Sequence, residues 1–298
     1  MSRKDEIEKL VETSAPIFED TADQIWEFAE LCYEETKSSS LQKAVLKDLG
    51  FTIQEVHNMP TGFVASYGQG HPIIAILGEY DALANLNQKA DCDHPETMEP
   101  GGTGHGCGHN LLGAASMCAV NAVKNYMEEH KLSGTIRYYG CPAEEGGSAK
   151  TFMVRDGYFK DCDIELSWHP AQFNYGWDGK DCLGTYNILF KFKGIAAHAA
   201  ACPQLGRSAL DACELMNVGV NYLREHVIQE ARIHYAYLNA GGTAPNVVQA
   251  EAELSYVIRA PKMSDMYSIA DRVIDCARGA ALMTSTEMSY KVVSGNPI

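Results

Sequence analysis

The sequence is poor in basic residues. It has 24 Lys and Arg against 39 Asp and Glu, which gives a formal net charge of −15. Because phosphate groups repel such a chain, we expect neither nucleic acid nor an anionic membrane surface as a partner. No run reaches the ~18–20 apolar residues that a membrane span needs. The opening stretch "MSRKDEIEKL" has no apolar signal core, so the sequence predicts a cytoplasmic protein.

A disulfide framework is also missing. The ten cysteines are scattered without regular spacing, and we therefore expect reduced, mostly buried thiols. With 46% hydrophobic and 21% charged residues, the composition is that of an ordinary globular protein. A length of 298 residues is enough for two domains.

The glycine-rich stretch "GGTGHGCGHN", residues 101–110, lacks the signatures of phosphate binding. A dinucleotide fingerprint starting at Gly102 or Gly104 would need glycine in the sixth position, where Cys107 or His109 stands instead. A Walker loop would need a lysine, and the stretch has none. Three interpretations stay open: a purely structural loop, a thiol nucleophile at Cys107, and a metal-ligand pair. If the segment is extended, Cys107 and His109 point the same way and can share one ion.

The order of predicted elements indicates two domains. Up to about residue 183, a long helix over 5–35 interrupted near Pro16 precedes alternating strands and helices, which favours an α/β layer with a mostly parallel sheet. Residues 84–109 form a long loop, which in compact domains is usually functional or disordered. Residues 184–298 read as βαββαβ, the complete set of a ferredoxin-like unit.

Further candidate ligands follow predicted strands. Glu144 and Glu145 stand side by side in "CPAEEGGSA", and His169 ends a strand in "ELSWHP". An acidic first helical turn and a hydrogen-bonded core histidine would explain them separately. Together with Cys107 and His109 they fall where strands end, the edge at which open parallel sheets bind ligands. Mixed S, N and O donors favour Zn²⁺ or a similar ion, and a spare glutamate suits a general base.

In these motifs the sequence resembles the aminoacylase and carboxypeptidase-type family of metal-dependent amidohydrolases, which are metallopeptidases. The branch it resembles is that of the p-aminobenzoyl-glutamate hydrolases, with hippurate and auxin-conjugate hydrolases as relatives. The resemblance covers nearly the whole chain and rests on "EETKSS", "LGEYDAL", "GHGCGHN", "CPAEEGGSAK", "WHP", "FKGIAAHAA" and "GGTAPNVVQAEAEL" followed by Arg259. It implies a zinc-peptidase-like catalytic domain, begun by residues 1–183, into which a ferredoxin-like lid and dimerisation domain, residues 184–298, is inserted.

The resemblance implies a role for each matching residue of the first domain. Cys107 and His109 match the first pair of metal ligands, with Cys107 as a candidate bridge between two ions. Glu144 matches the general base, Glu145 the ligand beside it, and His169 the next ligand. The implied cofactor is one or two ions of Zn or Mn per protomer. The implied reaction is hydrolysis of an N-acyl or aroyl amino acid, a small molecule, by metal-activated water.

The resemblance also implies four supporting residues. Asp81 matches an acidic residue that supports the ligands without binding the metal itself. His198 matches a histidine of the smaller domain that reaches the active site of the partner protomer and stabilises the oxyanion. Asn246 and Arg259 match residues that hold the substrate's carboxylate or oxyanion. A homodimer through the second domain is therefore expected.

The sequence departs from the family pattern in two places. Relatives often carry an Asp and a later His after Cys-Gly-His, where this chain has Asn110, Leu111 and Leu112. The family also takes a last metal-ligand histidine from a carboxy-terminal stretch, and none of the 10 histidines lies beyond His234. On that basis we expect an incomplete catalytic domain with little activity of its own. The source of the last ligand, the metal and the acyl group stay open. A truncated, non-catalytic dimerising or regulatory homologue is the alternative function.

Overall fold

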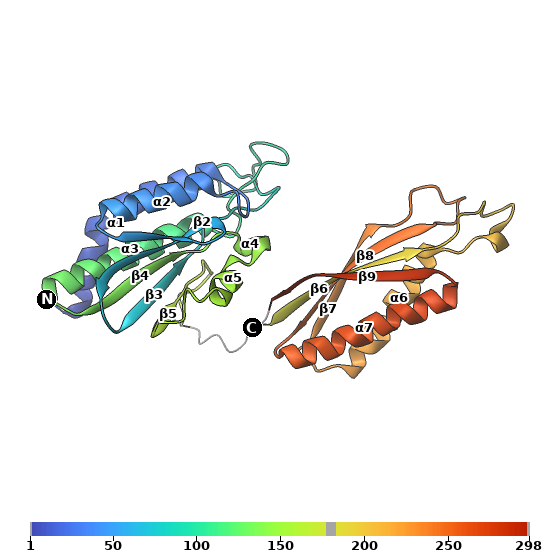
Figure 1. Cartoon of the computed structure of the whole chain (residues 1–298). Coiled ribbons are helices and arrows are strands. Elements are labelled where there is room, and N and C mark those ends of the chain that lie inside the picture. Colours follow the sequence, from blue (N-terminus) through green and yellow to red (C-terminus); the bar gives the residue numbers. More distant parts are fainter. Residues whose placement is uncertain (1, 177–182, 297–298) are drawn as a thin grey trace. The chain divides into compact units, whose positions relative to one another are not determined.

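The structure, a computed structural model, describes residues 2–176 and 183–296. The chain divides into two compact units, Met1–Tyr175 and Gly176–Ile298 (Figure 1). The domain boundary predicted between residues 183 and 184 follows residues 177–182, which lie outside the described residues.

The first unit is a sheet with helices on both faces. Its elements are, in chain order, α1 (Arg3–Phe28), α2 (Thr36–Asp48), β1 (Thr52–Val56), β2 (Met59–Gln69), β3 (Ile73–Gly78), α3 (His109–His130), β4 (Gly134–Gly140), α4 (Glu144–Gly147), α5 (Ala149–Arg155) and β5 (Ile164–Leu166). The long loop predicted over residues 84–109 is present up to Gly108.

The sheet of the first unit is mixed, so the prediction of a mostly parallel sheet is wrong. Its strand order is β1-β2-β4-β3-β5. β3 pairs in parallel with β4 and β5, whereas β2 runs antiparallel to β1 and β4. The reason is local: only His57 and Asn58 separate β1 from β2, and so short a connection can join only antiparallel strands.

Helix α1 runs through Pro16 without the predicted interruption. Pro16 lies on the exposed side of the helix, where water can satisfy the backbone carbonyl that the proline leaves free. The opposite side keeps its packing because Phe18, Ala22 and Ile25 are buried. The helix ends at Phe28, before the predicted residue 35, because Ala29 adopts a left-handed conformation.

Two hydrophobic clusters hold the layers of the first unit together. One joins α1, α2 and α3 to the sheet through residues such as Phe18, Leu46 and Met117. The other contains Tyr139 of β4 and Met153 of α5. Figure 1 shows α1, α2 and α3 on one side of the sheet and α5 on the other. The carboxyl ends of β3, β4 and β5 therefore share one edge of a sheet covered on both faces.

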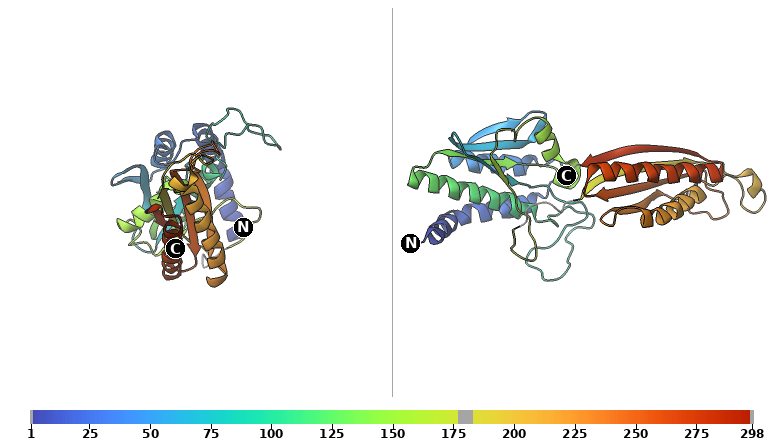
Figure 2. Two further views of the ribbon diagram at one scale, coloured as in Figure 1. Left: turned by 90° about the vertical axis from the view of Figure 1, so that its right-hand side faces the viewer. Right: turned by 90° about the horizontal axis from the view of Figure 1, so that it is seen from below.

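The second unit is a four-stranded antiparallel sheet with two helices on one face. Its elements are β6 (Gly184–Lys193), the 3-10 turn η1 (Pro203–Leu205), α6 (Ala209–Leu223), the 3-10 turn η2 (Arg224–His226), β7 (Arg232–Asn239), β8 (Glu251–Ala260), α7 (Met263–Thr284) and β9 (Glu287–Asn296). The strand order is β7-β8-β6-β9, and Figure 2 shows α6 and α7 side by side on the sheet. Alternate residues of β6, Ile188, Phe190 and Phe192, are fully buried beneath these helices.

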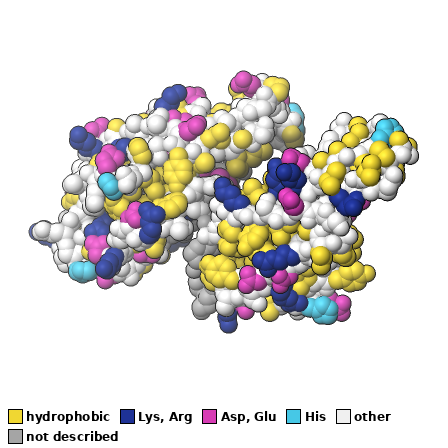
Figure 3. All heavy atoms as spheres, turned by 45° about the vertical axis from the view of Figure 1, so that its right-hand side comes forward, with side chains coloured by type: hydrophobic (Ala, Val, Ile, Leu, Met, Phe, Trp, Pro, Cys, Tyr) yellow, Lys and Arg dark blue, Asp and Glu magenta, His cyan; other side chains and the backbone are white. Residues whose placement is uncertain are grey.

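The surface of the described residues carries both signs of charge. On the face shown in Figure 3, Lys and Arg side chains are intermixed with Asp and Glu side chains. Among the described residues, none of the helices combines the length and the apolar character needed to span a bilayer.

Candidate metal centre

The predicted ligands of the first unit come from segments that follow β3, β4 and β5. Asp81 follows β3, Glu144 and Glu145 begin the short helix that follows β4, and His169 follows β5. Because these three strands are parallel neighbours, their carboxyl ends meet at one edge of the sheet. The glycine-rich segment before α3 lies at the same edge.

Cys107 and His169 lie in direct contact. The Sγ atom of Cys107 is 3.1 Å from Nε2 of His169. The other ring nitrogen of His169 donates a hydrogen bond to the Pro170 carbonyl over 2.9 Å, which leaves the Nε2 lone pair free to bind a metal. Ligand atoms of Cys107, His109 and His169 all lie within 4.8 Å of one another.

The convergence of Cys107 and His109 has a different cause from the predicted one. Gly108 is not extended but left-handed, with φ 75° and ψ 25°, and His109 is already the first residue of α3. A residue with a Cβ would be strained at this φ, and the Cβ would lie 3.0 Å from Pro170. The glycine therefore turns the chain sharply between the two ligands beside the His169 segment.

His109 is completely buried and holds its ring between acidic groups. Its Nδ1 donates a hydrogen bond to Oδ1 of Asp81 over 2.9 Å. Its Nε2 lies 3.0 Å from Glu79 Oε2, 3.9 Å from Glu144 Oε2 and 4.0 Å from Glu145 Oε1. Burial opposes the charged ring, but the hydrogen bond to Asp81 and the charge of Glu79 leave the pKa of His109 raised.

Three buried polar atoms in this cluster have no hydrogen-bond partner: His109 Nε2, Glu79 Oε2 and Glu145 Oε1. His109 Nε2 and Glu79 Oε2 are only 3.0 Å apart, but their geometry does not make a hydrogen bond. With Nδ1 donating to Asp81, two acceptors face each other unless a positive charge lies between them. A divalent cation would satisfy these atoms, and S, N and O donors together fit the chemistry of Zn²⁺ and similar ions.

Several side chains hold the glutamate pair in place. Asp81 reaches across the site: its Oδ2 accepts a hydrogen bond from the backbone N–H of Glu145 over 2.9 Å. Glu35 accepts one from the N–H of Ala143 over 2.7 Å, and the Tyr33 hydroxyl donates to the Gly147 carbonyl over 2.7 Å. The turn that carries Glu144 and Glu145 is thus held at both ends by the segment after α1.

Four residues of this arrangement are missing from the sequence-based prediction: Glu79, Lys150, Glu35 and Tyr33. Glu79 contacts Lys150 through its second carboxylate oxygen, and Glu79, His109 and Glu144 form a second group of ligand atoms within 4.8 Å. One signal was available for Glu79, since it stands two residues before Asp81 in "GEYDAL" and directly follows β3.

The other predicted residues belong to the second unit and lie in two separate places. His198 forms an isolated bridge with Val247, and the N–H of Ala199 donates to the Asn246 carbonyl over 2.9 Å. Arg259 instead pairs with Thr185 at the start of β6. His198 and Asn246 are therefore together, and Arg259 lies towards the opposite end of the sheet.

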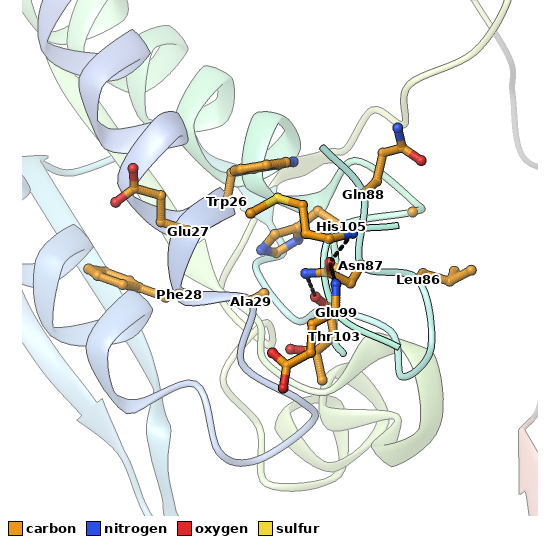
Figure 4. A pocket seen from close by; sticks show the side chains of 13 residues that line it. Trp26, Glu27, Phe28, Ala29, Leu86, Asn87, Gln88, Glu99, Thr103 and His105 are labelled. Carbon is orange, nitrogen blue, oxygen red and sulfur yellow. Dashed lines mark hydrogen bonds between the residues drawn. The ribbon is translucent and has the colours of Figure 1, made fainter. Parts of the chain in front are cut away.

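A cavity of about 570 Å³ adjoins the glycine-rich segment (Figure 4). One wall is the end of α1, with Trp26 and Phe28, and the other is the loop before α3, including Asn87 and His105. The His105 ring contacts the Ile25 carbonyl over 3.0 Å and so connects the two walls. The cavity lies beside the segment that leads into Cys107 but contains none of the predicted metal ligands.

Comparisons with known proteins identify relatives of the chain. The profile of peptidase family M20/M25/M40 matches residues 75–290. The chain is 53% identical over 286 residues to the B subunit of the p-aminobenzoyl-glutamate hydrolase of Escherichia coli K12, covering 96% of this chain and 59% of that protein. It is 29% identical over 273 residues to mouse Xaa-Arg dipeptidase, covering 87% of this chain and 59% of that protein. The chain thus spans well under two thirds of these curated relatives.

Two solved structures share the fold. A Bacillus subtilis protein described as a dinuclear metal-binding peptidase of the M20 family has a TM-score of 0.71 at 18% identity, covering 96% of this chain and 75% of that one. The aminobenzoyl-glutamate utilization protein of Klebsiella pneumoniae also has a TM-score of 0.71, at 20% identity, covering 98% and 78%. At these identities the likeness concerns the fold alone.

Replacing Asp81 should weaken metal binding without unfolding the protein. In Asp81→Ala, His109 loses the partner of its Nδ1 and the Glu145 backbone loses its acceptor. We expect a 10- to 100-fold weaker Zn²⁺ affinity, the usual loss when a residue that orients a ligand is removed. Competition with a chromogenic chelator measures it. The control is Asp156→Ala, which removes a surface carboxylate paired with Arg155; equal affinities in the two variants would contradict the role of Asp81.

Metal uptake should release protons. Burial, and then the neighbouring Glu145, raise the pKa of the Cys107 thiol to about 12, so without metal the thiol is protonated at neutral pH. Binding must displace that proton, and for this one group the apparent affinity should fall about tenfold for each unit of decreasing pH. Calorimetry in two buffers of different ionisation enthalpy counts the protons. Cys107→Ser should release about one fewer, and an unchanged count would argue against thiolate ligation.

Proposed function

The chain belongs to peptidase family M20/M25/M40, and from that premise we propose that it hydrolyses the amide bond between an acyl or aroyl group and an amino acid. The observation that carries the proposal is the convergence of unpartnered donor atoms from Glu79, His109 and Glu145 beside the Cys107–His169 pair. Such a buried acidic and imidazole cluster is suited to a divalent cation and to the water it activates.

Cys107, His109, Glu145 and His169 are the proposed ligands. Glu79 and Glu144 form a second group of donor atoms with His109, which is enough donors for one ion or for two. Zn²⁺ and Mn²⁺ both accept such mixed donors. When bound, the cation supplies Lewis-acid polarisation of the amide carbonyl and a lowered pKa for the attacking water.

Glu144 is the proposed general base. Its side chain is 41% exposed, more than that of Glu145 at 21%, and so it can reach a substrate and its water. Burial, and then the charge of Glu79, raise the pKa of Glu144, which brings it closer to the neutral range in which a base is most effective. Glu144 accepts the water's proton and delivers it to the leaving nitrogen.

His198 is the proposed donor to the oxyanion. Its Nδ1 accepts hydrogen bonds from the N–H groups of Ala200 and Ala201 over 3.2 and 3.1 Å. Those contacts place the ring proton on Nε2, where an exposed N–H is available to a developing negative oxygen. Asn246 lies beside His198 and is proposed to bind the same end of the substrate.

The register of the second unit supports a dimer. Arg259 lies eight residues along β8 from Glu251, which pairs with Lys193 at the far end of β6, or about 27 Å at the usual rise of a strand. His198 and Asn246 lie beyond that far end. One small substrate can meet Arg259 and the His198–Asn246 pair only if they come from different chains. We therefore propose residues 184–298 as a lid and dimerisation domain inserted into a catalytic domain that begins with residues 1–183.

The partner in that dimer is proposed to be a second copy of this chain. A related chain is the second candidate, because the E. coli relative is named as the B subunit of its enzyme and the A subunit of that enzyme is 29% identical to this chain over 241 residues.

The proposed substrate class, an aroyl or acyl amino acid such as p-aminobenzoyl-glutamate, rests on the same relatives. Hydrolysis of this compound with Zn²⁺ or Mn²⁺, by the chain alone and mixed with the E. coli A subunit, tests both proposals. Metal and conjugate binding without turnover would support the non-catalytic alternative.

Glu144→Gln and Glu145→Gln should have different effects. Glu144→Gln should keep its metal and lose about 100-fold or more in kcat, as expected when a general base is removed. Glu145→Gln should bind metal at least about tenfold more weakly, because a carboxylate ligand is replaced by an amide. Metal content and turnover are measured on both. Equal metal loss would contradict the division of roles, and exchanged effects would reverse it.

Two inactive variants should restore activity together. In a hybrid of a His198→Ala chain and a Glu144→Gln chain, one site has both an intact base and an intact histidine from the neighbour. With free exchange of protomers, an equal mixture should recover about a quarter of wild-type turnover. The control mixes His198→Ala with Asn246→Ala, whose residues lie at the same end of one chain, so that no site is intact. Recovery in neither mixture would count against sharing between chains.

A further inference from the structure

The loop between β3 and α3 carries a second cluster of metal-ligating side chains. Cys92, His94 and Glu96 stand at alternate positions in "CDHPE" and contribute donor atoms that all lie within 4.8 Å of one another. Cys92 Sγ is 3.4 Å from Glu96 Oε2, and His94 Nε2 is 3.5 Å from the same oxygen. None of the three belongs to the candidate metal centre.

These distances match the spacing of ligands around zinc. With Zn–S near 2.3 Å and Zn–N and Zn–O near 2.0–2.2 Å, tetrahedral ligand atoms lie about 3.3–3.7 Å apart. The sulfur–oxygen and nitrogen–oxygen separations in this cluster fall in that range. The cluster therefore needs no rearrangement at these two pairs of atoms to bind a tetrahedral ion.

The histidine of this cluster is oriented as a metal ligand. Its Nδ1 donates to Oδ1 of Asp93 over 2.9 Å, which leaves the lone pair of Nε2 directed to the side where Glu96 lies. A metal-ligating histidine usually donates its other N–H to a carboxylate in this way. Glu96 keeps one oxygen for the ion, because Lys89 contacts Oε1 over 3.0 Å and Oε2 faces Cys92 and His94.

The backbone beneath the ligands is held by two amide side chains. Gln88 donates to the His94 carbonyl and accepts from the N–H of Glu96, both over 3.3 Å. Asn87 accepts from the N–H groups of Met98 and Glu99 over 3.0 and 2.9 Å. The ligands are therefore presented by a loop whose conformation is already braced, which lowers the entropy cost of binding.

We propose that Cys92, His94 and Glu96 form an accessory site for a divalent cation of the zinc class, with water in the fourth position and Asp93 orienting His94. The site lies in the loop that forms one wall of the cavity in Figure 4, to which Asn87 and Glu99 contribute. A cation there would link Cys92, His94 and Glu96 and so stiffen this part of the loop.

The test is metal binding by the full chain, with Co²⁺ and Zn²⁺ as probes. Cys92→Ser and His94→Ala should each abolish one equivalent of bound Zn²⁺, or weaken it at least about tenfold, and Cys92→Ser should remove part of the thiolate-to-cobalt charge-transfer band. Cys107→Ser should keep that equivalent, and the Cys92→Ser, Cys107→Ser double variant should lose the band entirely. Cys276→Ser, outside both clusters, is the matched control.

A second measurement separates binding from misfolding. The substituted side chains lie on a surface loop, so the thermal unfolding of the metal-free variants should match that of the wild type. Zn²⁺ should slow proteolytic cleavage of residues 84–104 in the wild type and in Cys107→Ser but not in Cys92→Ser. Unchanged Zn²⁺ stoichiometry and affinity in both Cys92→Ser and His94→Ala would overturn the site, and so would an equal loss in Cys276→Ser.

Discussion

The carboxylate of Asp81 is the contact on which the candidate metal centre depends. One of its oxygens accepts the Nδ1 proton of His109, and the other accepts the backbone N–H of Glu145. Asp81 follows β3, His109 starts α3, and Glu145 belongs to α4. A single buried side chain therefore sets the relative positions of three elements. By accepting the Nδ1 proton, Asp81 also fixes the tautomer of the His109 ring, so that Nε2 is the nitrogen left to bind a metal.

The same arrangement places several carboxylates together in a buried, poorly solvated site. Glu79 and Asp81 are buried, and the Glu144 and Glu145 carboxylates are near. Lys150 contacts Glu79, but its single positive charge cannot balance several carboxylates. Burying such a group costs several kcal/mol per ion unless opposite charge compensates it. The pKa values of His109 and Glu144 are both raised, so uptake of a proton, which lowers the net negative charge, is easier at these two groups than it is in water. A divalent cation would compensate the negative charge without protonating the proposed base.

Sequence reasoning selected most of the side chains that the structure brings together, because Glu144, Glu145 and His169 follow strands, and strand ends are visible as changes in periodicity. Backbone conformations that depend on a single residue could not be predicted from periodicity. The sequence predicts an extended segment in which Cys107 and His109 point the same way, whereas Gly108 is left-handed and brings the two residues together by a sharp turn. Glu79 was missed because an acidic residue after a strand is common, and only the approach of α3 makes it a neighbour of His109. The opposite placement of Arg259 and His198 follows from the register of β6 and β8, which one sequence does not specify.

Glycines decide how closely these elements can approach. A Cβ on Gly113 of α3 would lie 2.5 Å from the Glu79 carbonyl, and one on Gly147 would lie 2.3 Å from the Tyr33 ring. Both distances are far below van der Waals contact, so a larger residue would push α3 away from the end of β3 or α4 away from the segment after α1. Because metal ligation tolerates errors of only a few tenths of an ångström, such a displacement would separate His109 from Glu79 even with every ligand still present. The small residues between the ligand motifs therefore belong to the centre as much as the ligands do.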